Sequence, residues 1–193
     1  MRLRAVCAAA LLVAPASGAR ALGGTATQLR GGGKEWLVAG KPQLTLEAAD
    51  TMASAAILEA RNRNFKDISV FVVDVGGRVL VSKTMVGVPV LIPSLARAKA
   101  GAAIGTHSAS RALTTKYVPD KAPQLIAMTT VGNLDGKSFI AVPGGVLLRD
   151  ENGNVVGAIG VSGASADEDE HCAIVAAQSL GGLLTEPTQS PLQ

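Results

Sequence analysis

Aromatic side chains are scarce in this chain of 193 residues, which has one Trp, one Tyr and three Phe, about 3% of the total. So few flat side chains leave little surface for stacking bases, which argues against a protein that binds single-stranded nucleic acid. Hydrophobic residues nevertheless make up 48% of the chain. The core must therefore be built from Val, Ile, Leu and Ala.

The first 21 residues have the pattern of a targeting signal rather than of a folded element. Arg2 and Arg4 precede a short apolar run, and Ala19-Arg20-Ala21 offers small residues for cleavage. The run is too short to cross a bilayer, so we expect no stable membrane span. We expect residues 1–21 to be a signal peptide for the secretory pathway or secretion, or the first half of a bipartite address to an organelle lumen.

Removal of residues 1–21 takes away one of the two cysteines and the net positive charge of the chain. Cys7 leaves with it, so that Cys172 alone remains and no intrachain disulfide is possible. Three of the 18 basic side chains leave and no acid does, which leaves 15 basic against 15 acidic side chains. A chain without a basic surplus offers no electrostatic footprint for nucleic acid.

The remaining length suits one domain. Residues 22–43 contain two glycine clusters and no periodic pattern, so we expect a flexible leader there. Residues 44–184 carry the periodic patterns of the domain, and residues 185–193 form a C-terminal tail.

Alternating helix and strand patterns predict an α+β fold. Alanines at spacings of three and four predict a helix over 44–64, capped by Thr45, and small residues predict another over 94–113, capped by Ser94. Gly76-Gly77 predicts a hairpin turn between two strands. The remaining predictions are strands at 68–75, 78–83 and 154–162, short extended pieces on either side of Pro143-Gly144-Gly145, and a helix over 167–184; residues 124–131 fit a short helix or a strand. Hairpin turns make the sheet mostly antiparallel, with helices covering it.

The stretch Asp167-Glu-Asp-Glu-His-Cys172 raises the question of a chemical site. Acids at the start of a helix interact favourably with its free N–H groups, and we favour this interpretation. Glu168, His171 and Cys172 are candidate metal ligands, but no second cysteine supports a zinc site. Ser162 and Ser165 lack the G-x-S-x-G spacing of a nucleophile.

Two further features suit a ligand. Lys99, Ala103 and His107 recur at every fourth position of the predicted second helix, so an ammonium and an imidazole would share one stripe with a small gap between them. They are either ordinary polar residues of the helix surface or contacts to a flat anionic ligand. Gly144-Gly145 either frees two N–H groups for an anion or forms a bulge without a ligand.

Several motifs together resemble a known family. They are Asp74-Val-Gly-Gly-Arg-Val-Leu80, Ala96-Arg-Ala-Lys-Ala100, Pro143-Gly-Gly-Val146, Val156-Gly-Ala-Ile-Gly-Val-Ser-Gly163 and Asp167-Glu-Asp-Glu-His-Cys-Ala173. In this order they resemble the GlcG/HbpS-type heme-binding domain, which also occurs at the C-terminus of PduO-type corrinoid adenosyltransferases. The resemblance covers residues 44–184.

This resemblance implies a profilin-like fold of α/β/α layers with a five-stranded antiparallel sheet, and a homo-oligomer. It also implies a protein that binds heme, a tetrapyrrole, in heme or iron handling or sensing. An oxidative heme-degrading enzyme and a ligand-free structural domain stay open as alternatives. We expect heme to lie against the second helix, with its propionates near Lys99, Gly144 and Gly145. Neutral imidazole is a good iron ligand, so His107 is the predicted metal ligand.

Overall fold

The computed structural model describes residues 30–31, 34–35 and 42–192, and it divides into two units, 1–40 and 41–193. In the first unit, β1 (Arg30–Gly31) pairs antiparallel with β2 (Lys34–Glu35). The predicted signal peptide and most of the predicted leader lie outside the described residues. All of the following concerns the second unit.

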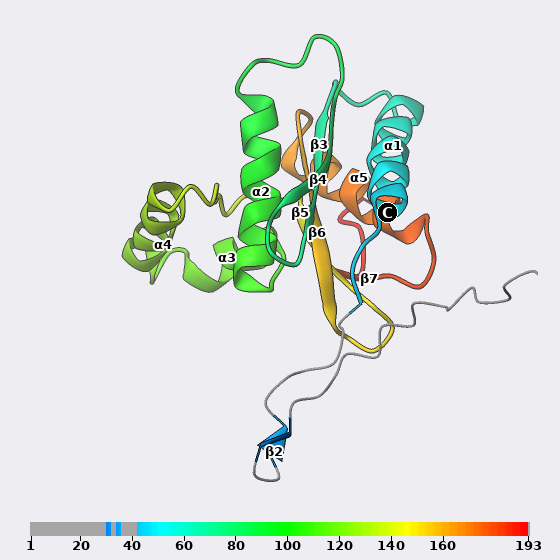
Figure 1. The fold of residues 1–193 in the computed structure, drawn as a ribbon. Helices are drawn as coiled ribbons and strands as arrows, with labels where there is room; N and C mark the ends of the chain where they lie inside the picture. Colours follow the sequence, from blue (N-terminus) through cyan, green and yellow to red (C-terminus); the bar gives the residue numbers. More distant parts are fainter. Residues whose placement is uncertain (1–29, 32–33, 36–41, 193) are drawn as a thin grey trace, which may run out of the picture. The chain divides into compact units, whose positions relative to one another are not determined.

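The centre of the second unit is one antiparallel sheet with strand order β4-β3-β6-β5-β7 (Figure 1). Its strands are β3 (Ser69–Asp74), β4 (Val79–Thr84), β5 (Gly145–Arg149), β6 (Val155–Ser162) and β7 (Leu184–Glu186). The predicted five-stranded antiparallel sheet is therefore confirmed.

Helices cover both faces of this sheet. α1 (Leu46–Asn62) and α5 (Ala166–Gln178) pack on one face, and α2 (Ile92–Thr106) packs on the other (Figure 1). Beyond α2 lie α3 (Ser110–Tyr117) and α4 (Ala122–Leu134). The predicted α/β/α layering is confirmed.

The larger part of the core lies between the sheet and the α1–α5 layer. Thr45 caps α1 as predicted, because its hydroxyl accepts from the Ala48 N–H at 3.2 Å. The alanine stripe of α1 is fully buried, and it meets β-branched side chains of β3 and β6 that pair across the sheet, such as Val70 with Val161.

On the other face α2 lies very close to the sheet, and two strand glycines make this possible. A Cβ atom on Gly160 would lie 2.2 Å from the Ala96 carbonyl oxygen, and one on Gly145 would lie 2.2 Å from the Lys99 carbonyl oxygen. At these two positions only a residue without a side chain fits below the helix.

Several predicted boundaries were wrong. The helix predicted over 94–113 is two helices, because His107 adopts the left-handed conformation with φ 51° and ends α2. Ser94 is not the N-cap, since α2 begins earlier and Leu91 occupies the cap position without a side-chain hydrogen bond. The undecided segment around 124–131 belongs to α4.

The fifth strand also differs from the prediction. The extended piece before Pro143 is not a strand, and the edge of the sheet is instead formed by β7 from residues 184–186. The last helix accordingly ends at Gln178, before the predicted 184. Part of the predicted tail thus belongs to the sheet.

Candidate functional site

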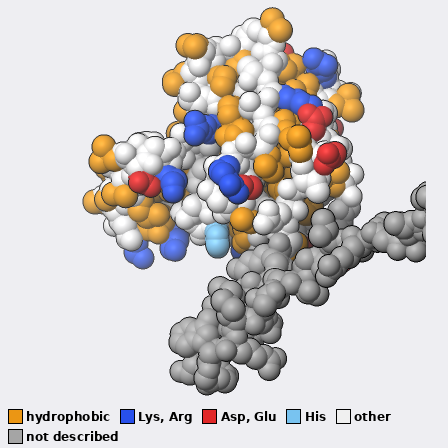
Figure 2. Space-filling view, in the orientation of Figure 1, with side chains coloured by type: hydrophobic (Ala, Val, Ile, Leu, Met, Phe, Trp, Pro, Cys, Tyr) orange, Lys and Arg blue, Asp and Glu red, His pale blue; other side chains and the backbone are white. Residues whose placement is uncertain are grey.

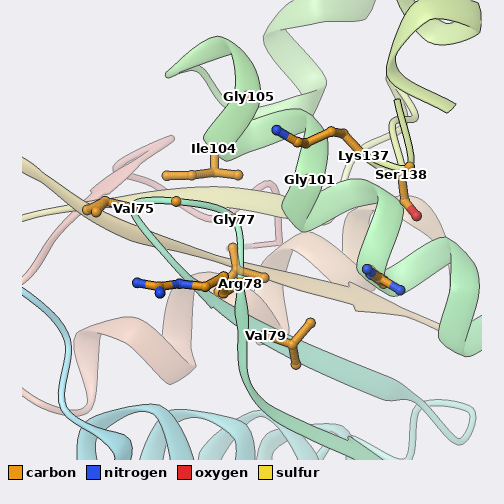
Figure 3. A pocket seen from close by; sticks show the side chains of 13 residues that line it. Val75, Gly77, Arg78, Val79, Gly101, Ile104, Gly105, Lys137 and Ser138 are labelled. Carbon is orange, nitrogen blue, oxygen red and sulfur yellow. The ribbon is translucent and has the colours of Figure 1, made fainter. Parts of the chain in front are cut away.

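A cavity of about 390 Å³ opens between the β3–β4 hairpin, α2 and the segment that follows α4 (Figure 3). Val75 and Val79 of the hairpin and Ile104 of α2 give it apolar walls. Five glycines also line it, which keeps the walls free of side chains: Gly76, Gly77, Gly101, Gly105 and Gly136. The result is a smooth cavity suited to a flat apolar group.

Three cations line this cavity and no acid does: Arg78, Arg97 and Lys137. The Arg78 guanidinium pairs with Asp74 at 2.8 Å, and Lys137 lies 3.6 Å from Asp135. Arg97 makes no ion pair within residues 42–192. The lining therefore carries positive charge available to an anion.

Asp74 fixes the shape of the β3–β4 turn through hydrogen bonds to Gly76 and Arg78. Its carboxylate accepts from the Gly76 N–H at 2.8 Å, the Arg78 N–H at 2.9 Å and the Arg78 side chain at 2.8 Å. Burial by itself raises the pKa of Asp74, but these donors outweigh it and hold the pKa below its ordinary value. The turn is thus held by an ionised carboxylate, which places Arg78 beside the cavity.

The face of α2 that lines the cavity is the stripe of Arg97, Gly101 and Gly105, with Ile104 beside it. The sequence pointed to a stripe shifted by two residues, which corresponds to a rotation of about 200° around the helix axis. The predicted stripe therefore lies on roughly the opposite side of the helix.

The premise that Lys99, Ala103 and His107 share one open surface is wrong. Lys99 and Ala103 are buried, whereas His107 is exposed. His107 leaves the helix as its left-handed C-cap, and its carbonyl oxygen accepts from Arg149 of β5 at 3.5 Å. His107 does not line the cavity. Its role as an iron ligand stays a prediction.

The structure does bring Lys99, Gly144 and Gly145 together. A Cβ atom on Gly144 would lie 3.0 Å from Lys99 Nζ, and Gly145 packs against the Lys99 carbonyl. However, the Gly145 N–H donates to Ser110 Oγ at 2.8 Å. That N–H is consequently not free for an anion, and a propionate-binding role for this group stays a prediction.

The acidic stretch starts a helix, as favoured, but it does more than interact with free N–H groups. Ser165 and Glu168 form a reciprocal capping box at the start of α5. Asp169 is buried and pairs with Lys99 at 2.7 Å, while Arg111 pairs with Glu170 at 2.6 Å and with Asp167.

Burial has the largest effect on the pKa values of Asp169 and Glu170. It raises the pKa of Asp169 and of Glu170, against the opposing effect of Lys99 and Arg111 respectively. Glu170 Oε1 is buried without a hydrogen-bond partner among the described residues, which strengthens the desolvation.

The histidine and cysteine of the same stretch are structural. His171 lies between Glu59 and Ser190, with ring nitrogens at 2.8 Å and 2.6 Å from their oxygens. Burial raises the pKa of the Cys172 thiol to about 12, which disfavours the thiolate form that a nucleophilic cysteine needs. Within the described part of the chain, no group of three or more His, Cys, Asp or Glu could hold a metal ion.

The geometry defines a layered α+β domain with a cationic, smooth-walled cavity beside its hairpin. The family model described as "Haem degrading protein HbpS-like" matches residues 44–178. The chain belongs to this HbpS-like family. Among curated proteins, no sequence matches it significantly.

Solved structures agree with this assignment. HbpS of Streptomyces reticuli, solved as a double mutant, is 31% identical, with a TM-score of 0.61 over 80% of this chain and 96% of that chain. Protein ORFY of Klebsiella pneumoniae is 27% identical, with a TM-score of 0.61 over 72% of this chain and 91% of that one. A PduOC:heme complex is 22% identical, with a TM-score of 0.64 over 75% and 99% of the two chains, and shows the shared fold.

No helix in the described residues combines the length and apolar character needed to cross a membrane.

Proposed function

We propose that this protein binds heme, or a related tetrapyrrole, in the cavity beside the β3–β4 hairpin. The observation that carries the proposal is the lining itself, which combines three cations, no acid and apolar walls. Membership in an HbpS-like family and the fold shared with a PduOC:heme complex support the choice of ligand.

The residues present fit the periphery of the group. A volume of about 390 Å³ lies within the range of ligand pockets, roughly 300–1,000 Å³. Val75, Val79 and Ile104 would contact the macrocycle, while Arg97, Arg78 and Lys137 would pair with the two propionates. Arginine suits this task because its planar guanidinium binds a carboxylate through two parallel hydrogen bonds.

The lining holds no His, Cys, Met or Tyr, the side chains that usually ligate heme iron. The residues that line the cavity would therefore contact the porphyrin ring and its propionates, not the iron. When bound, heme would supply a redox-active iron. His107, exposed two residues beyond Gly105, remains the predicted ligand to that iron.

Titration of residues 22–193 with hemin and with iron-free protoporphyrin IX separates these possibilities. Binding by the cavity alone predicts similar affinities for both, and an Arg97→Glu variant that weakens both. Ligation by His107 predicts tighter binding of hemin and an altered Soret band in His107→Ala. Arg61→Glu on α1 makes the same charge change at an exposed position away from the cavity and serves as the control. Absence of hemin binding would favour the ligand-free structural alternative.

Oxidative breakdown of heme is the second candidate, favoured by the family description. It predicts loss of the Soret band when ascorbate and oxygen are added in the presence of catalase. A Soret band that persists under these conditions would limit the protein to binding.

We further propose a homo-oligomer. No side chain of α4 is buried although the helix is largely apolar, and Figure 2 shows hydrophobic side chains over this helix. The loop between β4 and α2 exposes Val86 at 96% and Val90 at 95%. Surfaces of this kind usually mark interfaces. Light scattering during size-exclusion chromatography should give the molar mass of an oligomer for the wild type. The substitutions Ile126→Asp and Val86→Asp should lower this mass by dissociating the oligomer. A monomeric wild type would refute this.

A secretory or organellar destination for the chain is likewise a proposal, supported by the pattern of residues 1–21. Fusion of these residues to a fluorescent reporter should direct it out of the cytosol, and a cytosolic reporter would contradict the proposal.

A further inference from the structure

A second cavity, of about 250 Å³, lies between the first turns of α2, the start of α5 and the segment after α4. It shares no lining residue with the hairpin cavity. Its apolar wall is formed by Ile92, Leu95, Ile140 and Val142. Three polar side chains face this wall: Lys99, Ser162 and Asp169.

Lys99 is unusual because its amine is almost completely buried and yet lines a cavity. The residue is 3% exposed, and its Nζ makes one hydrogen bond, to Asp169 Oδ2 at 2.7 Å. An ammonium group can donate three hydrogen bonds. This nitrogen lies close to Gly144, where a Cβ atom would be only 3.0 Å from Nζ.

Ser162 is a second polar group without a protein partner. It is 4% exposed and lines the cavity, and its hydroxyl makes no hydrogen bond among residues 42–192. The hydroxyl is not fully enclosed, because the only fully enclosed side-chain atom without a hydrogen-bond partner among the described residues is Glu170 Oε1. The Ser162 hydroxyl can therefore donate a hydrogen bond to the oxygen of a ligand in the cavity.

The charges decide which kind of ligand fits. Three of the four acids at the start of α5 pair with two cations, Lys99 and Arg111, and the fourth acid has no cation partner in the part of the chain that the structure describes, so another anion would be repelled. An uncharged carbonyl oxygen can accept from both Lys99 and Ser162 without adding charge. The volume restricts the ligand to a small molecule and excludes a tetrapyrrole.

We propose that this cavity takes small, uncharged aldehydes or ketones and that Lys99 is a nucleophile that forms an imine with them. The Lys99 ammonium gives a proton to Asp169 along their existing hydrogen bond. The free amine attacks the carbonyl carbon while the Ser162 hydroxyl donates a hydrogen bond to the carbonyl oxygen. A proton then passes from the nitrogen to this oxygen, which gives a neutral carbinolamine. Asp169 returns the proton as the hydroxyl leaves, which yields a protonated imine, one water molecule and the original carboxylate.

The surroundings favour this chemistry. Burial raises the pKa of Asp169, which favours transfer of a proton to the carboxylate along the 2.7 Å hydrogen bond. Lysines activated by desolvation in an apolar pocket are established nucleophiles toward carbonyl compounds.

The experiment uses pentane-2,4-dione, an uncharged diketone that converts a free amine into an enaminone absorbing in the near ultraviolet. The protein without heme is incubated with the probe, and modified lysines are located by peptide mass spectrometry. Lys99 should react about tenfold or more faster than exposed Lys66, Lys116 and Lys121, which lie outside this cavity. Modification confined to exposed lysines would overturn the proposal and leave the pair purely structural.

Two variants test the cavity without removing the ion pair. Ser162→Ala should slow labelling of Lys99, and Leu95→Trp should block it by filling the cavity, while both leave labelling of exposed lysines unchanged. Equal Lys99 labelling in both variants and the wild type would show reaction through unfolding, which also overturns the proposal. Circular dichroism confirms that each variant is folded.

Discussion

Lys99 of α2 and Asp169 of α5 form an ion pair that connects the helical layers on opposite faces of the sheet. Their Nζ and Oδ2 atoms lie 2.7 Å apart, and the side chains are 4% and 2% exposed. The pair lies at the end of β6, where the chain passes from Ser162 into α5. Asp169 also accepts from the Ala164 N–H at 3.0 Å, so the carboxylate fixes this connection.

Removal of one partner of this pair should be strongly destabilising. In Asp169→Asn, Lys99 must either stay charged without a counter-charge or lose its proton, at a cost of about 3–5 kcal/mol in the free energy of unfolding. Urea denaturation measures this. The double variant Lys99→Met/Asp169→Leu should recover most of the loss, because both charges are gone. A change in Asp169→Asn of less than about 1 kcal/mol would place the pair in the class of weak surface ion pairs.

Alanine substitutions at two glycines should change stability in opposite directions, because one glycine lies under α2 and the other lies in α2 with open space around it. Gly160→Ala forces the helix away, because the new Cβ would lie 2.2 Å from the Ala96 carbonyl oxygen, and should cost about 1–3 kcal/mol or more. Gly105 lies within α2, and a Cβ atom there would have nothing within 4 Å. Gly105→Ala should therefore stabilise the protein by up to about 1 kcal/mol, because alanine favours a helix more than glycine does. Thermal unfolding of both variants tests this; a stable Gly160→Ala protein would contradict the packing described.

The contact between Glu59 and His171 predicts a pH dependence of stability. The hydrogen bond from His171 lowers the pKa of Glu59 below its ordinary value of 4.5, with burial opposing and Arg63 assisting. The folded carboxyl thus binds a proton less readily than the unfolded one. Its stabilising contribution is present above pH 4.5 and is lost as the pH falls through the folded pKa.

Glu59→Gln removes this titration. The difference in unfolding free energy between wild type and variant should be largest above pH 4.5 and should shrink as the pH falls below that value. Guanidinium titrations at several pH values provide the curve. A difference that stays constant, or that grows on acidification, would show that the contact does not lower the pKa.

The parts of the fold that the sequence predicted well are those decided by local pattern. The buried alanine stripe of α1 and its Thr45 cap follow from periodicity and cap chemistry, and Gly76-Gly77 marks the β3–β4 hairpin. The parts that were missed depend on tertiary contacts. The left-handed conformation of His107 has no sequence signal, and the three-residue strand β7 exists because it pairs with β5.

The candidate site shows the same division. The sequence-based prediction also used this helix, but Lys99, Ala103 and His107 have the same four-residue spacing as Arg97, Gly101 and Gly105, which line the cavity. Periodicity alone does not say which stripe faces the sheet. The distinction depends on Gly145 and Gly160, which receive the Lys99 and Ala96 side of the helix. A helix with alanine on most faces carries too weak an amphipathic pattern to reveal this.

The most direct test of tetrapyrrole binding in the hairpin cavity is a hemin titration of wild type, Gly105→Ala and Gly105→Leu. Gly105 lines the cavity with open space at its Cβ position, so alanine leaves room for the ligand whereas leucine occupies it. We predict that the alanine variant binds as the wild type does and that the leucine variant, equally folded, binds about tenfold or more weakly. Equal affinity and the same Soret band in all three proteins would contradict the location of the site.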